Sequence, residues 1–299
     1  MRERMGDSGF IGVFDSGVGG LSVWREIACQ LPHEDTLYLA DQSHVPYGSR
    51  PLYQVREFSE GIARFLLDQS AKVIVIACNT ASAAALHDLR RIFPAVAFVG
   101  MEPAVKPAVE QTCNGIVGVI ATQATFQGQL FASLVERYAD NVQVLTQACP
   151  GLVEAVEAGR LDTPETEALV QQYLAPLLEA GVDQLVLGCT HYPFLRPLIE
   201  RVAGTGRTVI DPAPAVARQV GRVLAQRGLE ADRGHLCARG TPVAGRLESL
   251  PHEARHVFCT TGDGAAFSAM IERLLPSIGA SVEVRTARWR GGHLEAQRQ

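Results

Sequence analysis

Two cysteines stand in closely similar surroundings at distant points of the chain. Cys78 begins the motif CNT after the apolar run VIVIA, and Cys189 begins CTH after LVLG. Each therefore lies where a strand would end and a helix would begin. Backbone N–H groups at the start of a helix favour a thiolate, so we expect both thiols to have a lowered pKa and to act as acids or bases.

The spacing of these motifs indicates an internal repeat. Cys78 and Cys189 are 111 residues apart (189 − 78), and Ser16 and Thr122, each following another apolar run, are 106 apart (122 − 16). Two similar offsets predict two related halves. If the halves face each other, the two thiols oppose each other across a cleft. Such a pair could take a proton from one face of a carbon and return it to the other, which is racemisation. The alternative for either cysteine alone is a small hydrophobic core residue.

Apolar, β-branched runs alternate with helical segments along most of the chain. This alternation predicts an α/β protein with mainly parallel sheets. We expect strands at 10–17, 35–42, 72–79, 95–100, 115–122, 142–149, 183–189, 207–212 and 256–263. The polar segment 226–256 is expected to be a surface excursion, and the tail 289–299 to be frayed.

Ligands of open α/β sheets bind beyond the carboxyl ends of the strands, so polar residues at those ends are the candidates for a site. They are Asp15, Ser16, Asp41, Cys78, Asn79, Thr80, Thr122, Cys149, Cys189, Thr190, His191 and Asp211.

Length and composition limit the possible functions. At roughly 150 residues per domain, 299 residues suggest two domains, and 47% hydrophobic with 20% charged residues is a globular composition. The net charge of −5 offers no basic field for nucleic acid. No apolar run reaches the ~18–20 residues of a membrane span, and the first residues lack a signal-peptide core, so we expect a cytoplasmic protein without a membrane partner.

Cofactor sites receive little support from the sequence. The seven cysteines form no C-x-x-C motif, which favours free thiols in a reducing compartment over a zinc site. Lys72 and Lys106 are the only lysines, so few positions could hold pyridoxal phosphate. A Cys189–His191 pair alone is weak support for a metal.

One further pattern leaves a rival open. GVFDSGVGGLS contains a G-x-G-x-x-S spacing after a strand, and Asp41 ends the next strand, as in a dinucleotide-binding fingerprint. Asp15 at the strand end would repel a pyrophosphate. A nucleotide-binding α/β protein built on Gly17, Gly19 and Gly20 remains the alternative from another functional class.

The motifs taken together resemble a known family. FDSGVGG, ADQSHVPYGSR, IACNTASA, ATQATF, ACPGLVEAVEAG, LGCTHYPFL, IDPA and TTGD resemble, in order, the blocks of the glutamate racemase family, within the cofactor-independent Asp/Glu racemase superfamily. The resemblance implies two pseudo-symmetric α/β domains, 1–101 with 212–299 and 102–211, and an active site in the cleft between them. It implies L- and D-glutamate as substrates, a role in peptidoglycan synthesis, and no cofactor or metal. A homodimer is possible, and an aspartate or hydantoin racemase is the nearest alternative.

The resemblance also implies a role for each candidate residue. Cys78 would act on D-glutamate and Cys189 on L-glutamate, with Asp15 beside the first thiol and Glu157 and His191 serving the second. The substrate-binding positions would be Asp15, Ser16, Tyr47, Gly48, Cys78, Asn79, Thr80, Thr122, Thr125, Cys189, Thr190 and His191. Thr125 could instead be an ordinary helix N-cap, and Gly151 and Ala155 depart from the family pattern around Glu157.

Overall fold

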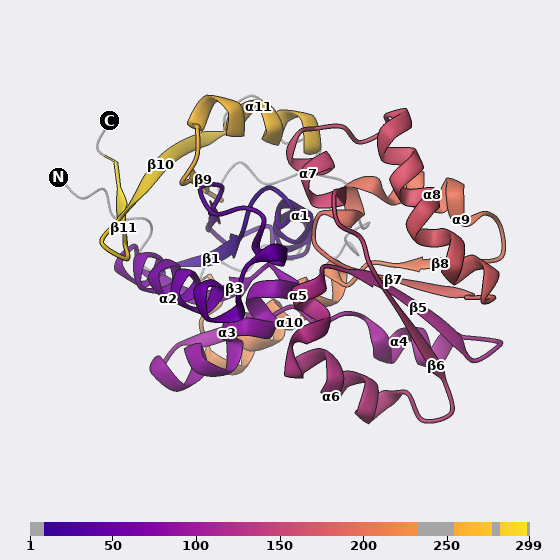
Figure 1. The fold of residues 1–299 in the computed structure, drawn as a ribbon. Coiled ribbons are helices and arrows are strands. Elements are labelled where there is room, and N and C mark those ends of the chain that lie inside the picture. The colour runs from indigo at the N-terminus through magenta and orange to yellow at the C-terminus, as the bar shows by residue number, and fades with distance from the viewer. Residues whose placement is uncertain (1–8, 232–253, 277–281, 298–299) are drawn as a thin grey trace.

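The computed structural model describes residues 9–231, 254–276 and 282–297. Its strands form two separate sheets (Figure 1). The larger has the order β11-β10-β9-β2-β1-β3-β4 and the smaller β6-β5-β7-β8. All neighbours pair in parallel except β10 and β11. The predicted α/β class and the nine predicted strands are confirmed.

The element bounds are as follows. The larger sheet contains β1 (Phe10–Asp15), β2 (Thr36–Ala40), β3 (Ala71–Ile76), β4 (Ala97–Gly100), β9 (His256–Thr260), β10 (Glu283–Arg290) and β11 (His293–Ala296). The smaller contains β5 (Ile116–Ala121), β6 (Gln143–Ala148), β7 (Gln184–Gly188) and β8 (Thr208–Ile210). The α-helices are α1 (Leu21–Gln30), α2 (Leu52–Asp68), α3 (Asn79–Ile92), α4 (Val105–Gln111), α5 (Gln123–Gln127), α6 (Gln129–Tyr138), α7 (Leu152–Glu157), α8 (Pro164–Glu179), α9 (Arg196–Ala203), α10 (Ala213–Arg227) and α11 (Gly264–Leu274). Two 3-10 helices are η1 (Tyr47–Ser49) and η2 (Tyr192–Leu195).

The two sheets repeat one strand order. In the larger sheet β1 lies between β2 and β3, with β4 beyond β3, and in the smaller sheet β5 lies between β6 and β7, with β8 beyond β7. β3 and β7 therefore hold equivalent places. Cys78 follows β3 and Cys189 follows β7, so the repeat seen in the sequence places both thiols at equivalent strand ends.

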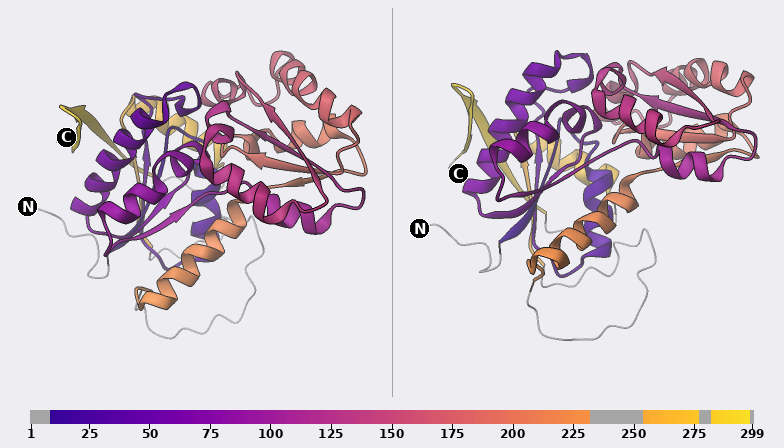
Figure 2. Two further views of the ribbon diagram at one scale, coloured as in Figure 1. Left: turned by 60° about the horizontal axis from the view of Figure 1, so that its bottom comes forward. Right: turned by 90° about the horizontal axis from the view of Figure 1, so that it is seen from below.

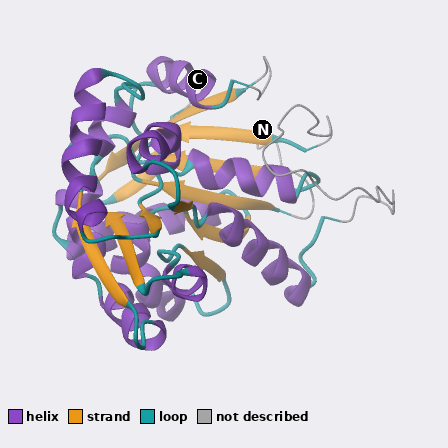
Figure 3. Ribbon diagram, turned by 90° about the vertical axis from the view of Figure 1, so that its right-hand side faces the viewer, coloured by secondary structure: helices purple, strands orange, loops and turns teal. Residues whose placement is uncertain are grey.

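Helices cover both faces of each sheet (Figure 3). Along β1 the side chains alternate: Phe10 and Phe14 belong to the core formed with α2 and α3, while Ile11 and Val13 belong to the core formed with α1 and α10. This alternation follows from the two-residue period of a strand. One core continues from the first half of the molecule, built on the larger sheet, into the second half, built on the smaller sheet.

The chain crosses between the halves twice. It leaves the larger sheet between β4 and α4 and returns between β8 and α10. α10 then packs on α1 beneath the larger sheet (Figure 2). The predicted domain boundaries, 101/102 and 211/212, lie in these crossing segments and stay predictions.

The expectation of a frayed tail is wrong for most of 289–299. β10 and β11 form an antiparallel hairpin around Gly291 and Gly292, which both have positive φ angles, 55° and 83°. Leu294 is buried, and Trp289 packs against Gly61 of α2. A Gly-Gly pair between two β-prone runs is a known hairpin signal, so the sequence did carry this information.

Two sequence expectations concern regions only partly described. Of the polar segment 226–256, residues 232–253 lie outside the described residues, and α10 ends at Arg227. Within the described ranges, no helix is long and apolar enough to cross a membrane.

Candidate active site

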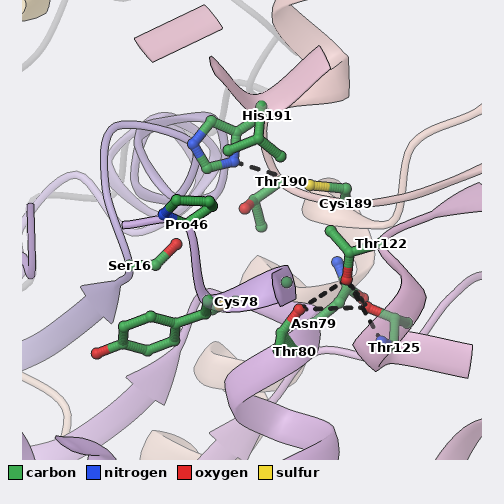
Figure 4. A pocket seen from close by; sticks show the side chains of 13 residues that line it. Ser16, Pro46, Cys78, Asn79, Thr80, Thr122, Thr125, Cys189, Thr190 and His191 are labelled. Atoms are coloured by element: carbon green, nitrogen blue, oxygen red, sulfur yellow. Dashed lines mark hydrogen bonds between the residues drawn. The ribbon is translucent and has the colours of Figure 1, made fainter. Parts of the chain in front are cut away.

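The carboxyl ends of β1 and β3 meet those of β5 and β7 around a small cavity (Figure 4). Its lining residues are Ser16, Pro46, Tyr47, Gly48, Cys78, Asn79, Thr80, Thr122, Thr125, Val153, Cys189, Thr190 and His191. All residues to which the family resemblance gives a role are among them except Asp15 and Glu157, which lie behind the lining. The cavity measures about 10 Å³, roughly the space of one water molecule.

Cys78 is held at the start of a helix and next to a buried carboxyl group. Its Sγ accepts a hydrogen bond from the Ala81 N–H at 3.4 Å, so Cys78 caps α3. Asp15 is fully buried, and its Oδ2 accepts from the Gly20 N–H at 2.8 Å. Burial raises the pKa of Asp15, partly opposed by His191, the Gly20 N–H and Cys78.

The pKa of Cys78 is shifted in the direction opposite to the one expected from the sequence. Burial and then the charge of Asp15 raise the pKa of Cys78 well above its usual range, and the Ala81 N–H opposes them only in part. A helix terminus contributes a modest stabilisation of the anion, whereas removal from water can move a pKa by several units. Cys78 is therefore held as a thiol whose anion, once formed, is a strong base.

Cys189 does not open an α-helix, contrary to expectation. The 3-10 helix Tyr192–Leu195 follows it, and α9 begins only at Arg196. Its thiol instead contacts His191, with Sγ 3.7 Å from Nδ1. On the other side of the ring, Nε2 of His191 lies 2.7 Å from Oε1 of Glu157. Cys189 therefore lies next to the His191–Glu157 pair and not at the start of an α-helix.

The His191–Glu157 pair is buried and carries shifted pKa values. Burial alone would lower the pKa of His191, but its hydrogen bonds and charge interactions with Cys189 and Glu157 outweigh burial and raise the pKa well above its usual range. Burial likewise opposes ionisation of Glu157, yet its pKa is lowered, because His191, the Val18 N–H and Gln42 donate hydrogen bonds to it. The raised pKa of His191 and the lowered pKa of Glu157 favour an imidazolium–carboxylate pair beside Cys189.

The glycine-rich turn after β1 does not have room for a nucleotide. A Cβ atom at Gly17 would collide with the carboxylate of Glu157, and one at Gly19 with the ring of His191. The Val18 N–H between them already donates to Oε1 of Glu157 at 2.7 Å. The nucleotide-binding alternative is therefore contradicted: the turn binds an anion, but this anion is a side chain of the protein's own second half.

Hydroxyl and amide groups fill the remaining wall of the cavity. Oγ1 of Thr122 lies 2.9 Å from Oγ1 of both Thr80 and Thr125, so the hydroxyls of the two halves form one cluster (Figure 4). Thr122 caps α5 by accepting from the Thr125 N–H at 3.3 Å, so Thr125 is not an N-cap. Both side-chain polar atoms of Asn79 are buried without a hydrogen-bond partner among the described residues.

Three strand-end candidates do not reach the cavity. Asp41 accepts hydrogen bonds from Tyr47, His44 and Trp289, and so supports the loop that carries Tyr47. Cys149 is buried, and burial followed by the charge of Cys189 raises its pKa to about 12.

The third strand-end candidate, Asp211, lines a separate cavity of about 650 Å³ beside the crossing segments. No group of three or more potential metal-binding side chains gathers anywhere in the described ranges.

Two lining residues were missed by sequence reasoning. Pro46 directly precedes Tyr47 and Gly48 in the P-Y-G motif, so its neighbours could have indicated it. Val153 carries no chemical signal, and only the placement of α7 brings it to the cavity.

The chain is similar to known proteins in both sequence and fold. The family model described as Asp/Glu/Hydantoin racemase matches residues 11–220. A glutamate racemase of Roseiflexus sp. strain RS-1 is 48% identical over 265 residues, which cover 88% of this chain and 91% of the relative. The crystal structure of glutamate racemase isoform RacE1 from Bacillus anthracis has a TM-score of 0.80 and 33% identity over 95% of this chain and 98% of that one.

A further solved structure was determined with a bound amino acid. Glutamate racemase from Francisella tularensis, in complex with D-glutamate, has a TM-score of 0.76 and 28% identity over 93% of this chain and 97% of that chain. The family match covers well over half of the chain, and the Roseiflexus relative extends the likeness over most of the remainder. The chain therefore belongs to the Asp/Glu/hydantoin racemase family, among its glutamate racemases.

Proposed function

We propose that this chain interconverts L- and D-glutamate by proton transfer between the substrate Cα and two thiols, Cys78 and Cys189. One observation carries the proposal: the two cysteines end equivalent strands of the two halves, and both line one cavity. A thiolate on one side removes the Cα proton. The thiol on the other side donates its own proton to the opposite face, which inverts the carbon.

We assign Cys78 to the D-enantiomer and Cys189 to the L-enantiomer. In the L-to-D direction, the Cys189 thiolate takes the Cα proton. A sulfur lone pair forms the new S–H bond, and the electrons of the broken C–H bond stay on Cα. The Cα carbanion then takes the proton of Cys78, which becomes the thiolate. Each turnover leaves the two thiols in exchanged protonation states, and the reverse reaction restores them.

The groups behind each thiol support this division. Asp15 raises the pKa of Cys78, which makes its anion a stronger base toward the weakly acidic Cα proton. Beside Cys189, an imidazolium at His191 supplies positive charge next to a forming thiolate, and Glu157 holds the ring in place.

The cavity wall suits an amino acid with two carboxylates. The hydroxyls of Ser16, Thr80, Thr122 and Thr190 and the unpartnered amide of Asn79 offer both donors and acceptors. Unsatisfied buried polar atoms are costly unless a ligand pairs with them. The D-glutamate bound to the Francisella relative supports glutamate as the ligand. We propose that the product D-glutamate serves peptidoglycan synthesis in a bacterial cytoplasm, with no further cofactor.

The first test separates the two thiols. Cys78→Ser and Cys189→Ser should each lower racemisation by at least about 10²–10⁴-fold, because a hydroxyl is a far weaker acid than a thiol. Circular dichroism of L-glutamate follows the loss, and L-aspartate tests the alternative substrate. L-aspartate racemised faster than L-glutamate would favour the aspartate racemase instead.

A one-sided reaction then identifies which thiol serves which face. The two enantiomers are equally stable, so any variant changes kcat/KM for both directions of racemisation by the same factor. The face on which each thiol acts must therefore be determined from a reaction that needs only one thiol. With 3-chloroglutamate, a thiolate removes the Cα proton, the Cβ–Cl bond breaks with loss of chloride, and the enamine hydrolyses to the keto acid and ammonium.

We expect Cys189→Ser to eliminate chloride from the D-configured isomer and Cys78→Ser from the L-configured isomer. Chloride release by both variants from the same isomer, or normal racemisation by either, would contradict the two-thiol mechanism.

A further inference from the structure

The carboxylate of Glu157 receives hydrogen bonds from both halves of the molecule. Its Oε1 accepts from His191 of its own half and from the Val18 N–H of the other half, both at 2.7 Å. Its Oε2 accepts from Nε2 of Gln42, also of the other half, at 3.3 Å. Gln42 follows β2 and does not line the cavity. Two of the three donors to Glu157 therefore come from across the interface.

The orientation of the Gln42 amide is set by its two neighbours. Oε1 accepts a hydrogen bond from the hydroxyl of Thr260, a buried residue of β9, at 2.7 Å. That hydroxyl in turn accepts from the Gly262 N–H at 2.9 Å, so its proton is directed to Gln42. A carboxylate can only accept, so the NH₂ group must face Glu157. Thr260 thus holds Gln42 in the one orientation that donates to Glu157.

Glu157 acts on Cys189 through His191. The donors to Glu157 keep its pKa low, and its charge contributes to the raised pKa of His191, whose Nδ1 faces the Cys189 thiol. The other titratable groups that face Glu157 are Asp15 and Tyr38 of the first half. Neither donates to Glu157 in the described residues, so Gln42 is its only side-chain donor from across the interface.

We propose that Gln42 is a positioning residue for the Cys189 half of the reaction. It orients Glu157, which orients His191, which serves the thiol. Because the donor belongs to the opposite half, the Cys189 side is complete only when the two halves are in contact. This inference rests on the proposed two-thiol function and adds to it a residue that touches neither substrate nor thiol.

The test is Gln42→Leu, which keeps the approximate size and removes the amide, made in each single-thiol background. In Cys78→Ser, where Cys189 is the remaining thiol, chloride release from L-configured 3-chloroglutamate should fall by about 10- to 100-fold, the usual effect of losing a hydrogen bond to a charged group. In Cys189→Ser, chloride release from the D-configured isomer should stay within about twofold, which also shows that the Leu variant folds.

Three further variants extend the test. Gln42→Glu places a second carboxylate against Glu157, so the acid limb of the pH profile for L-isomer elimination should move to higher pH. Gln172→Glu, at an exposed position of α8, makes the same change in formal charge and should leave that limb in place. Thr260→Val should lower L-isomer elimination in the same direction as Gln42→Leu, by a smaller factor.

The results distinguish the role of Gln42 from the two-thiol function on which it rests. Equal losses in both backgrounds, or no loss in either, would overturn the role of Gln42 while leaving two-thiol catalysis intact. Failure of Cys78→Ser itself to eliminate from the L-configured isomer would instead contradict the proposed function.

Discussion

At the scale of single residues, burial decides the acid–base chemistry of the site. Cys78 is 4% exposed and Asp15 is not exposed at all, so their charges are poorly screened and act strongly on each other. As a result, the Cys78 thiol is a weak acid, and its thiolate is a strong base. Such a group suits a reaction in which the carbon acid is weaker than any ordinary side-chain acid.

Asp15→Asn should therefore lower the pKa of Cys78. The amide keeps the shape of the carboxylate and an oxygen for the Gly20 N–H, but it removes the negative charge. We expect the midpoint for alkylation of Cys78 by iodoacetamide to fall by roughly 1–3 pH units, read by mass spectrometry of the Cys78 peptide in the Cys189→Ser background. Asp183→Asn, far from the cavity, serves as the control. An unchanged or raised midpoint would show that the carboxylate does not set this pKa.

At the scale of secondary-structure elements, the C-terminal hairpin supports one wall of the site from behind. Trp289 of β10 donates its indole N–H to Asp41 at 2.7 Å, and Asp41 accepts from the hydroxyl of Tyr47 at the same distance. Tyr47 lines the cavity. The hairpin depends in turn on α2, because the Trp289 ring rests where Gly61 leaves space for it.

Replacement of that glycine should destabilise the protein, against the usual trend. In an exposed helix, Gly→Ala is favourable by about 1 kcal/mol. In Gly61→Ala the added Cβ would lie 2.6 Å from Cζ3 of Trp289, and overpacking of this kind costs about 1–3 kcal/mol. Urea denaturation should thus give a lower free energy of unfolding. Gly221→Ala in α10 meets only the flexible end of Leu31, at 3.2 Å, and should be neutral or stabilising. A stabilised Gly61 variant would mean that the hairpin moves aside at no cost.

At the scale of the whole molecule, the cavity is too small for its proposed substrate. A space of about 10 Å³ cannot hold an amino acid, so we expect the two halves to separate at the cavity before glutamate enters. The two crossing segments, between β4 and α4 and between β8 and α10, are the only chain connections between the sheets in the described residues. They are therefore the natural hinge for such an opening.

A reversible crosslink between the halves should stop turnover. A Cβ at Gly128 of the second half would lie 2.7 Å from Cβ of Ala83 in α3, so the pair Ala83→Cys and Gly128→Cys needs a separation of about 1 Å more to reach disulfide geometry. Neither residue lines the cavity. The oxidised double variant should lose racemisation and regain it with dithiothreitol, while each single variant and the wild type, oxidised in parallel, should not. Full activity of the crosslinked protein would show that substrate enters without this opening.

The amino-acid sequence was sufficient to predict the fold class, the repeat and most of the cavity lining. Strand and helix periods are local, and parallel strands bring their carboxyl ends to one edge, so a polar residue such as Cys78 or Asn79 can be assigned to a site before any contact is known. The signal for the hairpin around Gly291 and Gly292 is equally local, because it consists of two adjacent glycines between β-prone residues.

What each group does at that edge depends on contacts between distant parts of the chain. The glycines of the first turn make room for Glu157 and His191, side chains more than a hundred positions away, although their spacing alone resembles a phosphate-binding loop. The pKa of Cys78 is raised and not lowered, because burial beside Asp15 outweighs the helix terminus. Both outcomes depend on how closely the two halves approach and how much water they exclude, and neither quantity is encoded in a local stretch of sequence.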